Sequence, residues 1–241
     1  MSATPAAAPP DREPIGRLAA RSVRHPLARA LLVMTFSTGL VDAVSYLGLG
    51  RVFTANMTGN VVLLGFGVAG SAGLPVVAPL VSLAAFLAGS AAGGVLAVRT
   101  ADRHAQHVAR ALGIEIVLIL GATIIAAATD VRPSTFAADT VIALLALAMG
   151  VRNATVRRLG VPDLTTTVLT MTLTGLAAES RLGGGSGQGS VRRLAAVLAM
   201  LAGAVAGALL LKISLVPPLL AAAALAGLVA LAYVPIARRE G

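Results

Sequence analysis

The chain contains no cysteine and no tryptophan, and it has few charged or aromatic residues. Without cysteine there is no disulfide framework, no thiolate metal site and no cysteine nucleophile. Charged residues make up 12% of the 241 residues and aromatic residues 3%, whereas soluble domains carry about 25% charged residues. This scarcity of charge argues against a soluble globular enzyme. Hydrophobic residues make up 57% of the chain, and an apolar excess of this kind argues equally against a disordered protein.

The abundant feature is long apolar runs. A membrane-spanning helix needs about 20 predominantly apolar residues, and six runs reach or approach this length: Leu27–Gly48, Leu74–Val98, Ala111–Ala128, Phe136–Val151, Leu194–Leu211 and Val216–Ile236. The fourth run is short and extends only by including Arg152 and Asn153. We therefore predict an all-α integral membrane protein with about six transmembrane helices. The polar residues 1–26 that precede the first run are predicted to form a disordered cytoplasmic tail.

Two further stretches are apolar but interrupted by polar side chains. Val52–Ala69 carries Asn56, Thr58 and Asn60 in its first half, and Leu164–Ala178 carries six threonines. Both stretches are compatible with full spans or with short re-entrant helices, because polar or irregular backbone is tolerated at membrane depth only where protein or a cavity surrounds it.

Lysine and arginine favour the cytoplasmic side of a membrane protein, so the charge distribution discriminates between these two topologies. If all eight stretches span, 11 of the 19 positive residues lie inside and 8 outside. If the two polar stretches re-enter, only Arg51, Arg132 and Lys212 lie outside, and 16 lie inside. We therefore predict six spans plus two short re-entrant helices, with both termini cytoplasmic.

The two halves of the chain resemble each other at an offset of about 111 residues, from position 39 to position 150. Gly39–Ala43 matches Gly150–Ala154, Thr58–Asn60 matches Thr170–Thr172, and Leu87–Gly93 matches Leu201–Gly207. Each half holds three spans, so the second half would begin on the opposite side of the membrane. The prediction is one transmembrane domain, 27–238, built from two inverted repeats at about 27–130 and 136–238, an arrangement that recurs in secondary transporters.

Two segments resemble the signatures of a known family. Thr38–Gly67, TGLVDAVSYLGLGRVFTANMTGNVVLLGFG, is similar to the first-helix signature of the YoaK family, and Met149–Glu179 is similar to its second signature. The likeness extends from about Leu27 to Arg238. It implies a multi-pass protein of the bacterial inner membrane, and it implies no particular activity, because the family is known as a domain of unknown function.

Asp42 is the sharpest candidate for chemistry, because it lies deep in the first span. A charged residue at the bilayer centre costs at least about 2.5–3.5 kcal/mol. Such a carboxylate is either a proton or cation site, or a helix-locking acceptor for a partner such as Asn60 or Ser45. Asn153 is its uncharged counterpart in the second half. The candidate substrate- or ion-contacting residues are Asp42, Asn56, Thr58, Asn60, Asn153, Thr166, Thr170 and Thr172.

Other polar residues are assigned structural roles. Arg152 is expected at the cytoplasmic boundary as a topology anchor, with pairing to Asp42 as the alternative, and Glu115 is expected to snorkel or to pair with an arginine. His104 and His107 have helical spacing but only Asp102 nearby as a third ligand, so no metal site is predicted. Small residues allow close helix packing, and the glycine pairs assigned to it are Gly89, Gly93, Gly203 and Gly207.

No HExxH helix, no Gly-x-Ser-x-Gly elbow and no paired catalytic aspartates occur, so an enzyme is not expected. No cofactor is expected, and topology accounts for the positive charge without nucleic acid. The leading hypothesis is a secondary-transporter-like permease for a small solute, with Asp42 as the ion or proton site. The alternative is a non-transporting membrane scaffold or sensor. The expected partners are the lipid bilayer and a small solute or proton, and a homo-oligomer is compatible with the glycine pairs.

Overall fold

The computed structural model describes residues 22, 24–71, 73–101, 103–161, 166, 169–180 and 183–240. Within these residues the chain is helical and has no β-strand. Most of the predicted tail, together with Asp102, Thr165 and Thr167, lies outside the described residues.

Six helices are long and apolar enough to cross a membrane, as predicted. They are α2 (Pro26–Ala43, continued by the π-helical turn η1, Val44–Gly48), α4 (Val77–Arg99), α5 (His104–Ala128), α6 (Phe136–Leu159), α8 (Ser190–Leu211) and α9 (Val216–Glu240). Two short helices separate them in sequence, α3 (Met57–Val68) and α7 (Thr170–Ala178). The chain is therefore an all-α integral membrane protein whose spanning helices contact the lipid bilayer.

Local sequence signals account for several helix ends. Pro26 occupies the first turn of α2, where its missing N–H costs nothing, and the His25 ring nitrogen accepts a hydrogen bond from the Leu27 N–H. Thr135 caps α6 by accepting from the Ala138 N–H. Gly160 ends α6 in the left-handed conformation, with φ of 63°, which glycine adopts without a steric penalty. The fourth span therefore runs past Val151 to Leu159 and contains Arg152.

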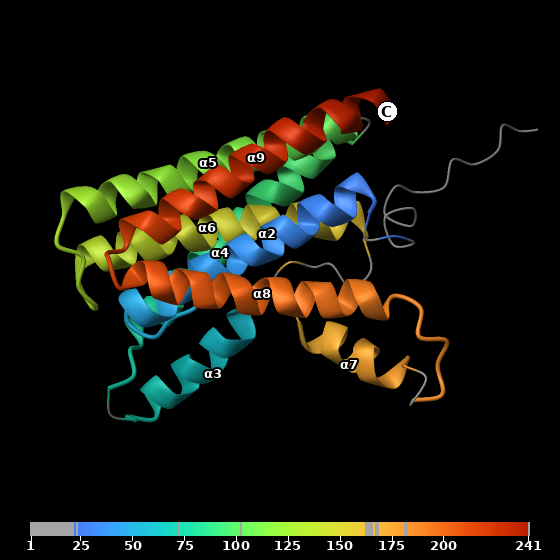
Figure 1. Cartoon of the computed structure of the whole chain (residues 1–241). Helices are drawn as coiled ribbons and strands as arrows, with labels where there is room; N and C mark the ends of the chain where they lie inside the picture. Colours follow the sequence, from blue (N-terminus) through green and yellow to red (C-terminus); the bar gives the residue numbers. More distant parts are fainter. Residues whose placement is uncertain are drawn as a thin grey trace, which may run out of the picture.

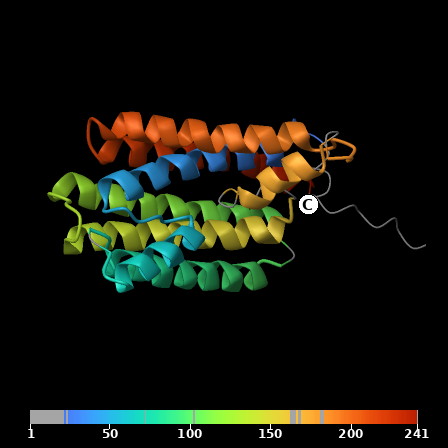
Figure 2. The same ribbon diagram turned by 90° about the horizontal axis from the view of Figure 1, so that it is seen from below.

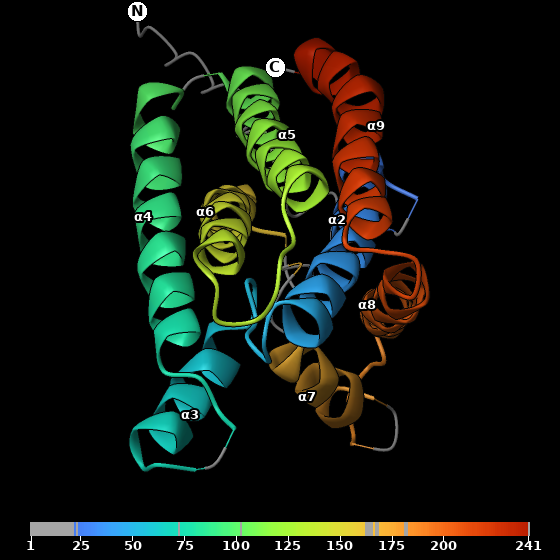
Figure 3. The same cartoon turned by 90° about the vertical axis from the view of Figure 1, so that its left-hand side faces the viewer.

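The six long helices run approximately along one axis, and the chain enters and leaves the bundle at the same end (Figure 1). We call this the proximal end; there α2, α5 and α8 begin, and α4, α6 and α9 finish. The opposite end is the distal end. In the end-on view α2 and α6 lie between the outer helices, and α3 and α7 lie on one side of the bundle (Figure 3). Of the six spans α2 is the most buried, whereas α4 and α8 present most of their surface outward.

The short helices do not cross the bundle. α3 begins near the middle of the bundle and runs back to the distal end. α7 also begins near the middle of the bundle, and it runs back to the proximal end (Figure 1). Viewed from below, α3 (teal) lies toward one end and α7 (gold) toward the other (Figure 2). The chain therefore crosses the bundle six times. Each short helix brings the chain back to the end of the bundle from which the loop before that helix started.

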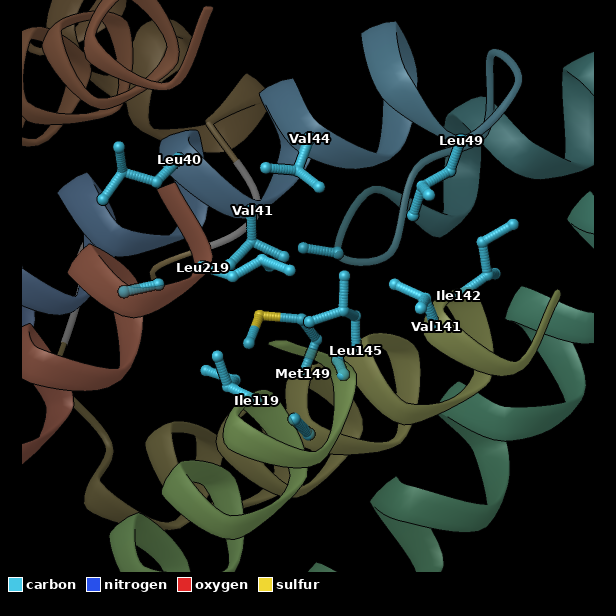
Figure 4. Close-up of a cluster of buried hydrophobic side chains, with 14 of the residues drawn as sticks. Leu40, Val41, Val44, Leu49, Ile119, Val141, Ile142, Leu145, Met149 and Leu219 are labelled. Atoms are coloured by element: carbon cyan, nitrogen blue, oxygen red, sulfur yellow. The ribbon is translucent and has the colours of Figure 1, made fainter. Parts of the chain in front are cut away.

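The buried side chains form two apolar clusters. The distal cluster includes Leu40, Val41, Leu145, Met149 and Leu219. Of these, Val41, Leu145, Met149 and Leu219 converge from α2, α6 and α9 (Figure 4). The proximal cluster joins the first half of α2 to the ends of α5, α6 and α9, and its members include Leu27, Leu31, Val108, Val156 and Tyr233. Between the two clusters, α2, α5 and α6 carry the polar side chains described below.

Glycines allow two pairs of helices to touch backbone to backbone. A Cβ atom on Gly203 of α8 would overlap the carbonyl oxygen of Phe36 on α2, and one on Gly89 of α4 would overlap that of Leu147 on α6. Gly207 and Gly93 lie one turn further along, against Ala43 and Ala154 in turn. Close approach of this kind provides dispersion contacts where lipid removes the hydrophobic driving force.

A methyl group at either contact should therefore loosen the bundle. We predict that Gly89→Ala and Gly203→Ala each destabilise the protein by about 1–3 kcal/mol, the usual cost of overpacking. Such a loss lowers the unfolding midpoint by about 2–4 °C per kcal/mol in a chain of this size, measurable by thermal unfolding in detergent.

Gly94→Ala is the matched control, because Gly94 lies beside Gly93 on α4 and a Cβ there meets no atom within 4 Å. Its midpoint should stay unchanged or rise slightly, since alanine is the better helix former. Equal losses in Gly94→Ala and Gly89→Ala would show that helix contact is not the cause.

Candidate functional site

A buried ion pair lies between the two apolar clusters. Arg152 of α6 is 3% exposed and Glu115 of α5 is 1% exposed. The guanidinium Nε donates to one carboxylate oxygen of Glu115 over 3.0 Å, and Nη2 donates to the other oxygen. The pair is therefore bidentate, which is the strongest geometry available to an arginine and a carboxylate.

The remaining guanidinium protons are donated to α2. Nη1 of Arg152 donates to the Met34 carbonyl oxygen over 3.0 Å and to Thr38 Oγ1 over 2.8 Å, and Nη2 donates to Ser37 Oγ over 3.2 Å. An arginine has five N–H donors, and all five have an acceptor here. Arg152 thus connects α2, α5 and α6 at one level of the bundle, the level at which the two apolar clusters meet.

The position of Arg152 corrects the expectation from sequence. We expected it at the cytoplasmic boundary, or paired with Asp42, and both expectations are wrong, because the side chain is buried on Glu115. Of the two alternatives for Glu115, pairing with an arginine is correct, with Arg152 as the partner. One signal could have indicated this: the fourth apolar run reaches the length of a span only if Arg152 lies within it.

A small cavity of about 40 Å³ adjoins the pair on its proximal side. Its walls are mostly apolar and extend from Leu27, Leu159 and Tyr233 to Glu115 and Arg152. A water molecule needs about 10–15 Å³ of such space and two or more polar partners. The cavity is thus large enough for a few water molecules, and its polar partners lie at its inner end.

Asp42 lies on the distal side of this level. It is half-buried, six residues before the end of the first span, which corresponds to about 9 Å along the helix axis. One carboxylate oxygen accepts a hydrogen bond from the backbone N–H of Ala55, in the loop between η1 and α3, over 3.2 Å. Ser45 donates to the backbone oxygen of Asp42 and not to its carboxylate. The partner of Asp42 is therefore the backbone of the loop.

Asn60 holds the same loop in place. Its amide oxygen accepts from the Phe53 N–H over 2.9 Å, and its amide nitrogen donates to the Phe53 carbonyl oxygen over 2.7 Å. Ser82 of α4 donates to that carbonyl as well and accepts from Asn60. Non-helical backbone is thus satisfied by side chains inside the bundle, as membrane proteins require. Asn56 has a separate role, because its side chain caps α3 by accepting from the Gly59 N–H.

The polar residues of the second half lie toward the proximal end. Thr172 of α7 is buried, whereas Thr170 is exposed at the start of that helix. Thr166 is buried in a left-handed backbone conformation, with φ of 61°, which is rare for a β-branched residue. Asn153 donates to the Met149 carbonyl oxygen of its own helix. Arg193 of α8 ties α7 to the bundle through the Gly175 carbonyl oxygen and Glu179.

The candidate residues therefore form separate groups. Asp42 and Asn60 both bind the backbone of the loop between η1 and α3, which we call the distal loop. Thr166 lies in the loop before α7, and Thr172 lies on α7 itself. Asn153 lies beside Arg152 on the proximal side of the ion pair. Two hydroxyls, those of Thr54 and Thr166, are buried without a hydrogen-bond partner in the described part of the chain. Thr58, which we also singled out, is exposed in the first turn of α3.

The ion pair makes a direct prediction for stability. Removing one partner leaves an unpaired buried charge, which typically costs about 3–5 kcal/mol. We expect Glu115→Leu and Arg152→Leu each to unfold at a much lower temperature in detergent, and the double substitution to be less destabilised than the sum of the two. Additive losses in this double-mutant cycle, read from unfolding midpoints, would contradict the pairing.

Comparison with known proteins supports the membrane assignment. Residues 30–232, most of the chain, match the family model described as protein of unknown function DUF1275. The chain is 31% identical over 150 residues to the UPF0700 transmembrane protein YoaK of Bacillus subtilis (strain 168). That match covers 62% of this chain and 65% of the Bacillus protein, slightly less than two thirds of its length. No solved structure matches the chain significantly. The chain belongs to the DUF1275 family of multi-pass membrane proteins, in agreement with the YoaK resemblance.

Proposed function

We propose that this protein is a secondary-transporter-like permease for a small solute, with Asp42 as its proton or cation site. The observation that carries the proposal is the hydrogen bond from the Ala55 N–H to Asp42, about 9 Å inside the end of the first span. It brings irregular backbone to a carboxylate at membrane depth. Interrupted helices with exposed backbone groups form the ion and substrate sites of many transporters.

An internal duplication with inverted repeats is part of this proposal. The contacts of α2 with α8 and of α6 with α4 involve corresponding residues: Phe36 and Gly39 on α2 lie 111 residues before Leu147 and Gly150 on α6. Gly203 on α8 and Gly89 on α4 are the corresponding contact residues on the partner helices. Each proposed repeat therefore packs its first helix against the third helix of the other. This exchange of partners produces two similar helix pairs, α2 with α8 and α6 with α4, and in the proposed mechanism these pairs rock against each other.

The two unsatisfied hydroxyls support the same correspondence. Thr54 and Thr166 are separated by the same number of residues as Thr58 and Thr170, and each lies in the loop that precedes a short helix. A buried hydroxyl without a partner costs about 1–3 kcal/mol. A bound solute or ion that accepts or donates one hydrogen bond at each loop would recover that cost, which is how the loops would contribute to binding.

Asp42 and the ion pair have different proposed roles. The Glu115–Arg152 pair has no net charge and every guanidinium proton is satisfied, so it is a fixed point about which the helices pack. The charge of an ionised Asp42 carboxylate has no arginine or lysine within salt-bridge distance in the described part of the chain. Proton or cation binding neutralises that charge, and the hydrogen bond to Ala55 couples the change to the distal loop.

The proposed membrane orientation rests on the distribution of positive residues between the two ends of the bundle. Arg99, Arg157 and Arg239 lie at the proximal end with most of the other positive residues, whereas Arg51, Arg132 and Lys212 lie at the distal end. Because positive loops remain cytoplasmic, we assign the proximal end, and with it both termini of the bundle, to the cytoplasm of a bacterial cell.

The proposal predicts that Asp42→Asn abolishes solute-driven proton movement and leaves the fold intact. The asparagine amide oxygen can still accept from Ala55, but the side chain can no longer take up a proton. The measurement uses proteoliposomes that contain a pH-sensitive dye, challenged with a panel of amino acids, sugars, organic acids and nucleosides. Asp139→Asn is the control, because Asp139 is a carboxylate in the first turn of α6 at the distal end.

A solute that moves protons through the wild type and Asp139→Asn, but not through Asp42→Asn, supports the role of Asp42. Equal proton movement in Asp42→Asn and the wild type would exclude that role. The scaffold or sensor alternative gains support if no solute in the panel moves protons through correctly folded wild-type protein.

A further inference from the structure

A polar cleft of about 490 Å³ opens at the proximal end, outside the groups described so far. It lies where the end of α4, the start of α5 and the end of α6 come together. The polar lining residues are Thr100, His104, His107, Arg157 and Arg158. Two arginines and two histidines line the cleft, and no carboxylate of the described part of the chain does.

The arginines face the cleft from the last turn of α6. Both are exposed, and in the described part of the chain neither forms a salt bridge. Their guanidinium groups are therefore available for a ligand that accepts several hydrogen bonds at once. His104 contributes a ring nitrogen 3.1 Å from the hydroxyl of Tyr233 on α9.

His107 provides an independent indication of a ligand. It is 3% exposed and its Nδ1 lies 3.0 Å from Thr100 Oγ1. The Thr100 hydroxyl donates its proton to the Leu96 carbonyl oxygen over 2.6 Å, so Nδ1 must be the donor to Thr100. Nε2 is buried and has no hydrogen-bond partner in the described part of the chain. His107 in the cleft wall thus has one ring nitrogen, Nε2, that is open to a hydrogen bond with a ligand.

The start of α5 adds a positive end to the same cleft. The capping position, Arg103, makes no side-chain hydrogen bond to the first turn, so within the described residues no side chain at the capping position caps the first N–H groups of this 25-residue helix. The N-terminus of a helix carries about half a positive charge and binds anions through these N–H groups. The helix N-terminus and the two arginines favour a ligand of negative charge. His107, whose Nδ1 carries the proton, offers Nε2 as an acceptor for a hydroxyl of that ligand, such as the P–OH of hydrogen phosphate or a hydroxyl of a lipid headgroup.

We propose that this cleft binds a phosphate group. A phosphate oxygen set accepts two or more hydrogen bonds from each guanidinium, a recognition that a monovalent halide cannot reproduce. The group is either the headgroup phosphate of an anionic phospholipid, since basic clefts between membrane helices bind such headgroups, or free inorganic phosphate. The site is independent of the permease proposal, because it uses none of the residues assigned to transport.

The test uses the full chain in a neutral detergent, with binding read as a rise in the unfolding midpoint. One arm adds sodium phosphate against sodium chloride of equal ionic strength. The other adds short-chain phosphatidylglycerol against short-chain phosphatidylcholine. The variant is Arg157→Gln combined with Arg158→Gln. The matched control is Arg238→Gln combined with Arg239→Gln, which removes the same charge from the last turn of α9 at the same end.

We expect phosphatidylglycerol, phosphate or both to raise the midpoint of the wild type and of the α9 control. The apparent affinity should fall at least tenfold in the cleft variant. A response to phosphatidylglycerol alone identifies a lipid headgroup, and a response to phosphate alone identifies the free anion. The single substitution Arg158→Gln, at an exposed position, repeats the test if the double variant folds poorly. The proposal fails if neither ligand exceeds its control, or if the α9 variant loses as much affinity as the cleft variant.

Discussion

The interaction on which the rest of the structure depends is the one between Arg152 and its five acceptors. A guanidinium and a carboxylate are costly to bury, and the cost is offset here only because Glu115, Ser37, Thr38 and the Met34 carbonyl oxygen accept every proton. These acceptors lie on α5 and α2, and Arg152 lies on α6. The register of α2, α5 and α6 is therefore determined at this level, and the distal and proximal apolar clusters form on either side of it.

The glycine contacts extend this arrangement outward. α8 packs on α2 through Gly203 and Gly207, and α4 packs on α6 through Gly89 and Gly93. The outer faces of α4 and α8 carry exposed apolar side chains such as Leu87, Val95 and Leu201, which suits contact with lipid. The bundle thus combines a polar centre, backbone contact at small residues and an apolar exterior. The polar centre and the small-residue contacts hold the helices together where lipid removes the hydrophobic driving force between them, and the apolar exterior matches the hydrocarbon core of the bilayer.

Much of this fold is predictable from the sequence, because the apolar length of each run and the placement of arginine and lysine are strong signals. The six spans agree with the prediction, and the ends differ mainly where polar helix termini such as His104 and Arg99 extend beyond the apolar run. The polar interactions were not predictable in the same way. Pairing of Arg152 with Glu115 depends on which faces of α5 and α6 meet, and a sequence without known contacts does not contain that information.

Asp42 illustrates the same limit. Its depth in the first span is visible in the sequence, and it left two alternatives open, a proton or cation site and a hydrogen bond to the polar segment after the span. A hydrogen bond to that segment is present. The partner is the Ala55 N–H and not a side chain, because every residue except proline offers a backbone N–H and composition does not reveal which one is used. Asn60 could be recognised as important but not as the residue that binds both backbone groups of Phe53.

The central claim is that the two short helices return to the side from which they enter, so that polar backbone reaches membrane depth. The most direct measurement is cysteine accessibility in inside-out and right-side-out vesicles, since the chain has no cysteine of its own. Single cysteines at Arg51 and Ser71 flank α3, and those at Arg157 and Ser186 flank α7. The account predicts that both members of each pair react from the same side, and that the two pairs react from opposite sides. Labelling of Arg51→Cys and Ser71→Cys, or of Arg157→Cys and Ser186→Cys, from different sides would contradict it.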